Sequence, residues 1–502
     1  MLFNSVAFIG YFLPIVFIGF LLAARVSRRL AAAWLILSSF FFYGWWDIRF
    51  VPLLAGSIAF NYVIGVALAK SPQTVRRKAI LIGGVALNLV LLGVFKYANF
   101  VIETINGLTA AGFPRADIIL PLGISFFTFT QIGFLLDVYA RIAEDYRLDH
   151  YVLFVTYFPH LIAGPILHHK QMMPQFENPG TYRFNMANLS GGLTIFLIGL
   201  AKKVILADNL ALFSRPVFHA VDWGGQTVTL FEAWGGVLAY TFQLYFDFSG
   251  YSDMAIGASR LFGIDIPLNF NSPFKSRNVA EYWRRWHMSL SQWFRDYLYY
   301  PLDIYFKRRN RNGGRWQAVI ISMTLIGLWH GASWTFVAFG ALHGVYLCVN
   351  GWWQQTVRRI LGKDFRGFGR TGHVAAVMLT FLCAIVGFVF FRAETFRGAA
   401  ALLVGMAGAN GAVLPEQIAS ILHLKGFVHT TGSMALLGNG QVMGVMEQTS
   451  LILGSMFICW CLPNTQTMTP RQQFWAIVCS FAFVVQAVFI ARAPSEFIYF
   501  QF

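Results

Sequence analysis

Runs of about 20 apolar residues recur along this chain, and they limit its possible folds more than any other feature. The first run, VAFIGYFLPIVFIGFLLAA, covers residues 6–24, and similar runs continue into the C-terminal region. Since the hydrocarbon core of a bilayer is about 30 Å thick, each run can cross it as a helix. The chain has 502 residues, 57% hydrophobic and 12% charged, which leaves room for about 12 such helices. We therefore predict an all-α polytopic membrane protein. The first run has no preceding basic segment and no cleavage pattern after it, so we expect a retained helix.

Basic residues gather in the segments between the apolar runs and account for the formal net charge of +16. These groups are Arg25, Arg28 and Arg29; Lys70, Arg76, Arg77 and Lys78; residues 307–315; and Arg358, Arg359, Lys363, Arg366 and Arg370. By the positive-inside rule they face the cytoplasm, whereas residues 46–49 and 101–117 face the other side. No interleaved base-stacking aromatic residues accompany them, so we expect membrane lipid and no nucleic acid as a partner.

Placing the basic segments in the cytoplasm and the intervening segments on the other side gives a predicted order of membrane spans. The predicted spans lie near residues 4–24, 30–46, 50–69, 79–99, 118–137, 187–207, 228–248, 373–391, 447–462 and 474–493. Residues 151–167 contain Pro159, Gly164 and Pro165, and we expect a re-entrant element there, because broken backbone at membrane depth must be shielded. Residues 249–315 fall in the cytoplasm, the Gly-rich stretch 405–446 falls outside, and both termini are periplasmic.

About 42 residues separate Arg315 from Arg358, enough for two helices with a tight turn between them. His330 and Gly331 fall at that turn, within LWHGASWTFVAFGALHG. An unpartnered polar group in lipid is expensive, so we expect His330, with Trp329 beside it, to line a cavity. His343, 13 residues later, is predicted to pack between helices behind the site. The adjacent His168 and His169 point to different helix faces without a third ligand, so we predict no metal site.

The segment NVAEYWRRWHMSLSQWFRDYLYYPL, residues 278–302, alternates charges with large aromatic residues. This pattern is typical of helices that lie at a membrane interface, and such helices need carry no chemistry. Glu281 has helical pairing distance to Arg284 and Arg285. In a functional interpretation the arginines meet an anionic ligand from the cytoplasm, and His287 lies on the approach to the buried site. Arg295 and Asp296 follow in the same segment and join the candidate donor-binding residues.

Polar residues follow one apolar span directly in QLYFDFSGYSDMAIG, residues 243–257. Asp247 and Asp253 are candidates for an ion or proton site, because carboxylates at membrane depth are functional candidates by default. Together with Ser249 they can equally cap a following helix, with Gly250 allowing a bend, and we favour capping and network roles over direct catalysis.

The chemistry that suits a buried histidine here is general-base catalysis. The chain has no G-x-S-x-G elbow, no P-loop and no dinucleotide-binding fingerprint. A neutral imidazole can take the proton of an acceptor hydroxyl as that hydroxyl attacks an activated acyl group.

Several ordered motifs together resemble the membrane-bound O-acyltransferase family, most closely its bacterial alginate O-acetylase branch. They are SVAFIGYFLPIVF, KYANF, LPLGISFFTF, YFPHLIAGPI, QLYFDFSGYSDMAIG, EYWRRWHMSLSQWFRDYLY, LWHGASWTFVAFGALHG, VFFRAE and FIYFQF. The resemblance implies one membrane domain over 1–502, with a histidine-containing core at about 118–357, C-terminal helices at 373–502 and a central tunnel. It implies that His330 is the catalytic histidine and His287 the second functional one.

The resemblance also implies a substrate set and a location. The donor is cytoplasmic acetyl-CoA as a co-substrate, with no bound cofactor, and the protein lies in a bacterial inner membrane. A periplasmic acetyltransferase partner receives the acetyl group for an exported polysaccharide. Alginate is the leading acceptor, with cellulose, another exopolysaccharide and peptidoglycan also open.

Two alternatives lie outside this assignment. Within enzymes, the chain transfers D-alanine or another acyl group to an envelope polymer such as teichoic acid. In a different class, it is a transporter or flippase that uses Asp247, Asp253 and the histidines as a proton relay. No internal repeat of the kind common in transporters is evident.

Overall fold

The computed structural model describes residues 1–72, 74–143, 147–309, 314–362, 369–421, 423, 429–431, 436–485 and 497–498. Its contacts divide the chain into two compact units that interleave along the sequence. Unit 1 comprises Met1–Leu200, Tyr251–Asn269 and Pro470–Phe502, and unit 2 comprises Ala201–Gly250 and Phe270–Thr469.

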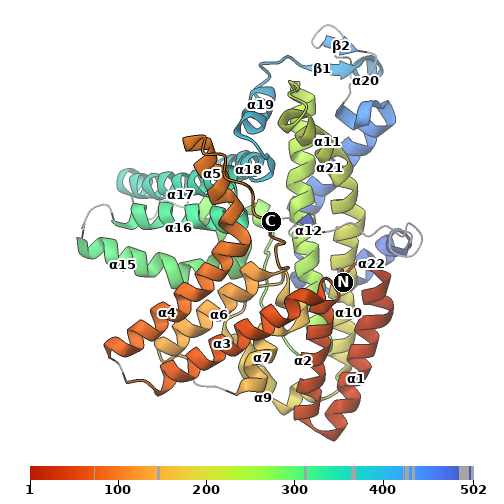
Figure 1. The fold of residues 1–502 in the computed structure, drawn as a ribbon. Coiled ribbons are helices and arrows are strands. Elements are labelled where there is room, and N and C mark those ends of the chain that lie inside the picture. The colour runs from red at the N-terminus through yellow and green to blue at the C-terminus, as the bar shows by residue number, and fades with distance from the viewer. Residues whose placement is uncertain are drawn as a thin grey trace. The chain divides into compact units, whose positions relative to one another are not determined.

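The regular elements of unit 1 are all helices among its described residues (Figure 1). Its helices are α1 (Leu13–Val26), α2 (Arg28–Gly44), α3 (Val51–Lys70), α4 (Val75–Leu92), α5 (Ala98–Thr109), α6 (Ile124–Tyr139), α7 (Leu148–Thr156), α8 (Phe158–Leu161), α9 (His169–Glu177), α10 (Met186–Ala201) and α22 (Pro470–Val485). A π-helical turn, Ala7–Phe12, leads directly into α1. Helices α1 and α2 form a hairpin in which Trp34 Nε1 donates to the Val16 carbonyl at 3.0 Å.

Unit 2 holds the remaining helices and a small sheet. The helices are α11 (Asp208–Asp222), α12 (Leu230–Leu261), α13 (Val279–Trp283), α14 (Met288–Phe294), α15 (Tyr300–Arg309), α16 (Gly314–His330), α17 (Trp334–Leu361), α18 (Gly369–Arg392), α19 (Phe396–Met406), α20 (Glu416–Ile421) and α21 (Val442–Cys461). The last 11 residues of α12 belong to unit 1. The strands β1 (Val413–Pro415) and β2 (His429–Thr431) pair in parallel, with Val413 opposite His429. This sheet, in the Gly-rich stretch, is a feature that the all-α prediction did not include.

Six helical segments in the described part of the chain are long and apolar enough to cross a membrane. They are Ala7–Val26, Ile48–Lys70, Val75–Thr109, Met186–Asp222, Gly369–Arg392 and Val442–Cys461. Each overlaps a span predicted from the sequence, so the multi-pass membrane assignment is confirmed. Helices α2 and α16, with 17 residues each, and α6, with 16, are too short to be counted among these six. The total of about 12 spans therefore stays a prediction, and the second half of the span near 474–493 lies outside the described residues.

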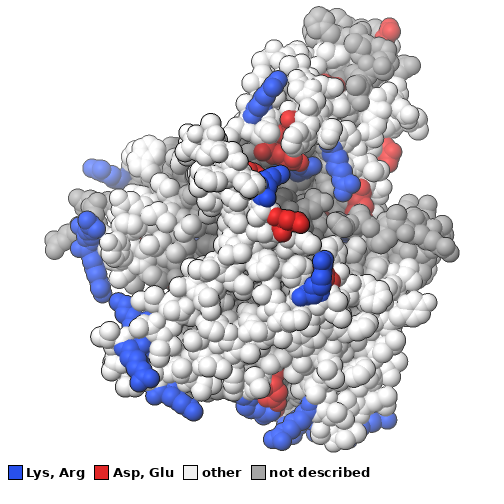
Figure 2. Space-filling model, viewed as in Figure 1, with Lys and Arg blue, Asp and Glu red and all other residues white. Residues whose placement is uncertain are grey.

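Charged side chains are distributed unevenly over unit 1. Figure 2 shows Lys and Arg side chains along the lower margin of the helices α1–α4, with a broad uncharged surface above them. Basic residues lie at the adjoining ends of these helices: Arg25 in the last turn of α1 and Arg28 and Arg29 at the start of α2, and Lys70 at the end of α3 and Arg76, Arg77 and Lys78 at the start of α4. This pattern is expected of a membrane helix bundle, in which charge stays at the ends of the spans.

The segment predicted to be re-entrant is indeed broken. Helix α7 ends at Thr156, the four-residue α8 follows, and residues 162–168 are irregular. Almost every side chain from 151 to 169 is buried, so protein shields the irregular backbone as its polar groups require. At Gly164 a Cβ atom would collide with the backbone of His160, which explains the glycine at this close approach.

Helix α12 corrects one prediction. The sequence placed a span end near residue 248 and a bend at Gly250, but α12 continues without interruption to Leu261. Asp247, Ser249 and Asp253 are therefore interior helix residues and cap no helix. The buried surroundings of this helix, rather than a chain end in water, accommodate its polar side chains.

Candidate active site

The hairpin of α16 and α17 carries the histidine that the sequence singled out. His330 is the last residue of α16, and α17 begins four residues later, where the Ser333 hydroxyl accepts the Thr335 N–H at 3.3 Å. The helices lie side by side (Figure 1), because Gly327 and Gly340 bring the backbones together. A Cβ at either position would collide with the opposite backbone. The predicted two-helix hairpin with His330 at its turn is confirmed.

Aromatic side chains enclose the His330 imidazole. Its ring centroid lies 5.0 Å from that of Trp329 and 5.1 Å from that of Phe391, both in edge contacts. Phe339 lies 6.1 Å away, also edge-on. Only 4% of His330 is exposed. The imidazole is therefore held in a low-dielectric environment formed largely by aromatic side chains.

His287 lies beside His330, although 43 residues separate them in the sequence. The ring centroids are 6.2 Å apart, and Trp329 is 6.1 Å from His287. Phe248 of α12 packs edge-on against His287 at 4.7 Å. We call His287, His330, Trp329, Phe248 and Phe391 the histidine cluster. All five belong to unit 2.

The backbone at His287 is unusual and fixes the direction of its side chain. His287 occupies the N-cap position of α14 with φ 43° and ψ 55°, in the left-handed region, which residues other than glycine enter at a cost. It is fully buried, and this burial lowers the pKa of its imidazole to about 3. The ring is therefore neutral at physiological pH, as a proton acceptor must be.

His343 contacts the segment that leads into His287. The Trp283 indole N–H donates to His343 Nδ1 at 3.2 Å, so a neutral His343 carries its proton on Nε2. His343 Nε2 faces Gly387 of α18, where a Cβ would collide with it. Trp283 ends α13, four residues before His287. This position agrees with the packing role predicted for His343, in which it holds α13 against α17.

The two arginines before His287 have different surroundings. Glu281 pairs with Arg285, whose Nη2 donates to Oε1 at 2.9 Å, and not with Arg284. Partial burial would raise the Glu281 pKa, but the backbone N–H of Arg277 and the charge of Arg285 hold it below its usual range. Arg284 is exposed and has no ion pair among the described residues. Of the two, Arg284 is the one that is free to meet an anion.

The remaining charged candidates are occupied with each other or with groups that the sequence did not suggest. Arg295 and Asp296 pair with each other at 2.9 Å on the surface. Asp247 is buried and pairs with Lys203 Nζ at 2.6 Å, and the same ammonium lies 2.9 Å from Asp208. The capping role predicted for Asp247 is wrong, while a network role agrees with this ion pair.

Ser249 and Asp253 follow Asp247 in the same helix. The Ser249 hydroxyl is buried, and no hydrogen-bond partner for it is found in the described residues. Asp253 belongs to unit 1 and lies six residues after Asp247, which places the two carboxylates on different faces of the helix. The two do not form the paired carboxylate site that the sequence left open.

Sequence reasoning missed several residues around the cluster. Lys203 carried a signal, because a lysine within the apolar stretch AKKVILA calls for a buried partner. Phe248 and Phe391 carried none, since an aromatic residue in an apolar helix is ordinary. In unit 1, His169 Nδ1 lies 2.8 Å from Asp137 Oδ2, a buried pair that the sequence also did not suggest.

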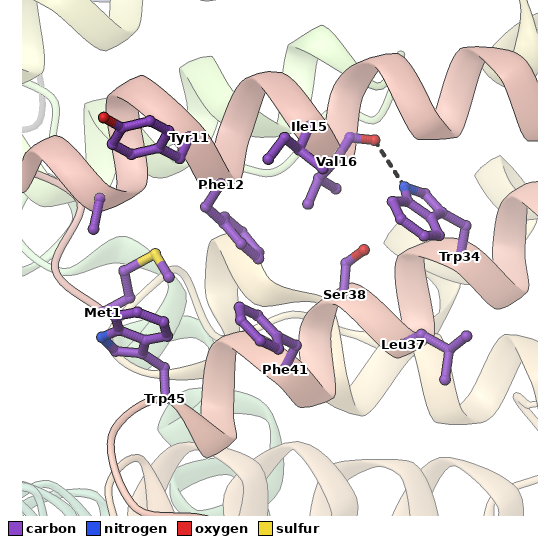
Figure 3. A pocket seen from close by; sticks show the side chains of 11 residues that line it. Met1, Tyr11, Phe12, Ile15, Val16, Trp34, Leu37, Ser38, Phe41 and Trp45 are labelled. Atoms are coloured by element: carbon purple, nitrogen blue, oxygen red, sulfur yellow. Dashed lines mark hydrogen bonds between the residues drawn. The ribbon is translucent and has the colours of Figure 1, made fainter.

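Three cavities in unit 1 contain none of the candidate residues. The largest, about 580 Å³, lies between α1 and α2 and is lined by apolar side chains such as Phe12, Ile15 and Phe41 (Figure 3). A second of about 440 Å³ lies between α3 and α4, and a third of about 240 Å³ is lined by charged residues. Within the described residues, no group of three or more His, Cys, Asp and Glu side chains is arranged to hold a metal ion. A tunnel through the histidine cluster stays a prediction.

Comparison with known proteins finds one matching family and relatives that are named as acyl-transferring enzymes. The model of the membrane-bound O-acyltransferase family matches residues 96–391, which include the whole histidine cluster. A peptidoglycan O-acetyltransferase of Helicobacter pylori is 36% identical, with 100% of this chain and 98% of that protein aligned. A probable alginate O-acetylase of Pseudomonas aeruginosa is 40% identical over 79% of this chain and 73% of its own length. A teichoic acid D-alanyltransferase of Streptococcus thermophilus is 30% identical over 54% of this chain and 68% of its own length.

Proposed function

This chain belongs to the membrane-bound O-acyltransferase family, and we propose that it transfers an acetyl group from cytoplasmic acetyl-CoA for O-acetylation of an exported or envelope polysaccharide. The observation that carries the proposal is the pairing of His287 and His330, 6.2 Å apart within one aromatic enclosure. Two imidazoles in such surroundings are suited to proton transfer.

The reaction requires one proton acceptor and one proton donor. The acceptor hydroxyl oxygen attacks the thioester carbonyl carbon, forming a C–O bond while its proton passes to the neutral His330 imidazole. The C–S bond then breaks, and the proton leaves with the sulfur as the free thiol. The aromatic rings around His330 hold its imidazole in a low-dielectric site, where the proton transfer would take place. A base placed in this way contributes about 10²–10⁴-fold to the rate.

The donor would reach the cluster along the segment that carries His287. Arg284 is exposed three residues before His287, and a guanidinium in that place suits the phosphates of a coenzyme A thioester. Arg285 would act indirectly, because its ion pair with Glu281 stabilises the short helix that positions His287. Trp329, in contact with both histidines, would form a wall of the acyl pocket.

The glycan of peptidoglycan is the first acceptor to test. The peptidoglycan O-acetyltransferase aligns with this chain from end to end, whereas the alginate O-acetylase, although more identical, aligns with 79% of it. An alginate-type polymer is therefore the second candidate. In either case a periplasmic acetyltransferase would receive the acetyl group and complete the transfer, and the protein would lie in the inner membrane with both termini in the periplasm.

A strain that lacks this protein tests the proposal when it is complemented with wild type, His330→Ala or His219→Ala at equal membrane abundance. His219 is an exposed histidine of α11 in the same unit and is the matched control. Alkali-released acetate is measured in purified peptidoglycan and in secreted polysaccharide. We expect acetate in one fraction with wild type and His219→Ala, and little with His330→Ala. Ester-linked D-alanine in place of acetate would favour the D-alanyl alternative, and full acetylation with His330→Ala would contradict the proposal.

A further inference from the structure

The charged cavity of about 240 Å³ in unit 1 has no role in acyl transfer as proposed above. It lies where α1 gives way to α2 and is lined by Arg28, Arg29, Arg147, Asp149 and Glu177, with buried His150 and Tyr182 behind them. Its walls come from three separate stretches of the chain, so it is formed by the fold and not by one loop. We propose that this cavity binds a phosphate group.

The charge balance of the lining favours an anion. Arg147 and Asp149 neutralise each other, since two guanidinium nitrogens donate to the carboxylate at 3.2 and 2.7 Å. Two arginines, Arg28 and Arg29, then face one carboxylate, Glu177. Neither arginine has an ion pair or a side-chain hydrogen bond among the residues that the structure describes. An oxyanion would therefore find two available guanidinium groups, each able to bind it with two N–H donors.

Both arginines also stand at an unfavourable end of a helix. Ser27 caps α2 by accepting the Leu30 N–H at 3.1 Å, and Arg28 and Arg29 are the first two residues of that helix. No acidic residue lies in its first turn. The positive end of the helix dipole repels cations, so the sequence places like charges together where an anion would relieve the repulsion.

The position of the cavity indicates where the phosphate comes from. The apolar span Ala7–Val26 ends one residue before Ser27, so Arg28 and Arg29 lie where the headgroup region of a bilayer begins. The phosphate of an anionic phospholipid is one source, and a soluble phosphate ester is the other. Both share the chemistry that two arginines recognise.

Binding to the purified full-length protein distinguishes a site from general surface charge. Phosphatidylglycerol is titrated against diacylglycerol with the same chains, which lacks only the phosphate headgroup, and bound lipid is counted by native mass spectrometry. The variant is R28Q/R29Q. The control is R25Q, which removes an exposed arginine from the last turn of α1 that does not line the cavity. Glycerol 3-phosphate is added as a competitor to test whether a soluble phosphate ester occupies the same site.

We expect phosphatidylglycerol to bind more tightly than diacylglycerol, and R28Q/R29Q to weaken it by roughly 10- to 30-fold while R25Q changes it less than threefold. Displacement by glycerol 3-phosphate, with the same dependence on Arg28 and Arg29, would identify a soluble phosphate as the ligand. Glu177→Gln removes the opposing carboxylate and should tighten binding, which provides a test if R28Q/R29Q does not fold. The proposal would be overturned if R25Q and R28Q/R29Q lost equal affinity for phosphatidylglycerol. It would also be overturned if phosphatidylglycerol and diacylglycerol bound equally tightly.

Discussion

Replacing Lys203 by methionine should destabilise the protein by about 3–5 kcal/mol, because it leaves a buried carboxylate without its partner. Lys203 is 1% exposed, and its Nζ lies 2.6 Å from Asp247 and 2.9 Å from Asp208. The side chain of Asp208 is 25% exposed and can turn to water, whereas that of Asp247 is 2% exposed and cannot. Most of the loss therefore comes from Asp247.

The cost can be worked from the protonation of that carboxylate. An Asp247 without Lys203 can avoid an unpaired charge by taking up a proton, which costs about 4 kcal/mol at pH 7 for a carboxyl with an ordinary pKa near 3.9. At pH 5 the same protonation costs only about 1.5 kcal/mol. The destabilisation by Lys203→Met should therefore shrink as the pH is lowered from 7 to 5.

The assay is unfolding of the purified protein in mixed micelles by a denaturing detergent at both pH values. Lys202→Met is the matched control, because Lys202 is the neighbouring lysine and donates to the Thr465 hydroxyl at 2.7 Å. The double variant Lys203→Met with Asp247→Leu removes both charges and should regain most of the lost stability. The reasoning is refuted if Lys203→Met changes stability by less than about 0.5 kcal/mol, or if its cost is the same at both pH values.

Two further variants test the surroundings of the histidine cluster. Trp283→Phe removes the N–H that reaches His343 Nδ1 at 3.2 Å and should cost about 1–3 kcal/mol, since a buried acceptor loses its partner; a stability equal to wild type in the same unfolding assay would exclude this contact. His287→Gln tests the buried neutral imidazole through pH. Burial lowers the His287 pKa to about 3. Below about pH 6.5 the unfolded chain therefore binds a proton at this residue that the folded chain does not bind. The free energy of unfolding is then highest above about pH 6.5 and falls as the pH is lowered toward about 3. Between pH 7 and pH 4.5 the wild type should lose about 2–3 kcal/mol more than His287→Gln, and parallel pH profiles would show that His287 is not held neutral.

Much of the fold follows from local signals in the sequence. Apolar runs of sufficient length predicted the spans that the structure shows between basic loops. The hairpin around His330 followed from the number of residues between Arg315 and Arg358, about 42, which is enough for two spanning helices with only a tight turn between them. The broken element near residue 160 followed from Pro159, Gly164 and Pro165, whose backbone preferences interrupt a helix wherever they occur.

The errors occurred where distant contacts override such signals. Gly250 and the polar residues beside it are typical of a helix end, yet α12 continues because its polar groups are buried, with Asp247 paired to Lys203. The partner of Glu281 was ambiguous between Arg284 and Arg285 at helical spacing, and the structure resolves it to the latter. The enclosure of His330 by Phe391 depends on packing between α16 and α18, which the spacing of residues within one segment does not reveal.

His330 is proposed to take the proton of the acceptor hydroxyl that receives the acetyl group. The most direct test is the rate of a single turnover with donor and acceptor on opposite sides of a membrane. Proteoliposomes are supplied with labelled acetyl-CoA on one side only and an acceptor on the other, and the first turnover is timed for wild type, His330→Gln and His219→Gln. Loss of about 10²–10⁴-fold with His330→Gln, and a wild-type rate with His219→Gln, is the predicted result. A first turnover with His330→Gln as fast as that of wild type would contradict the claim.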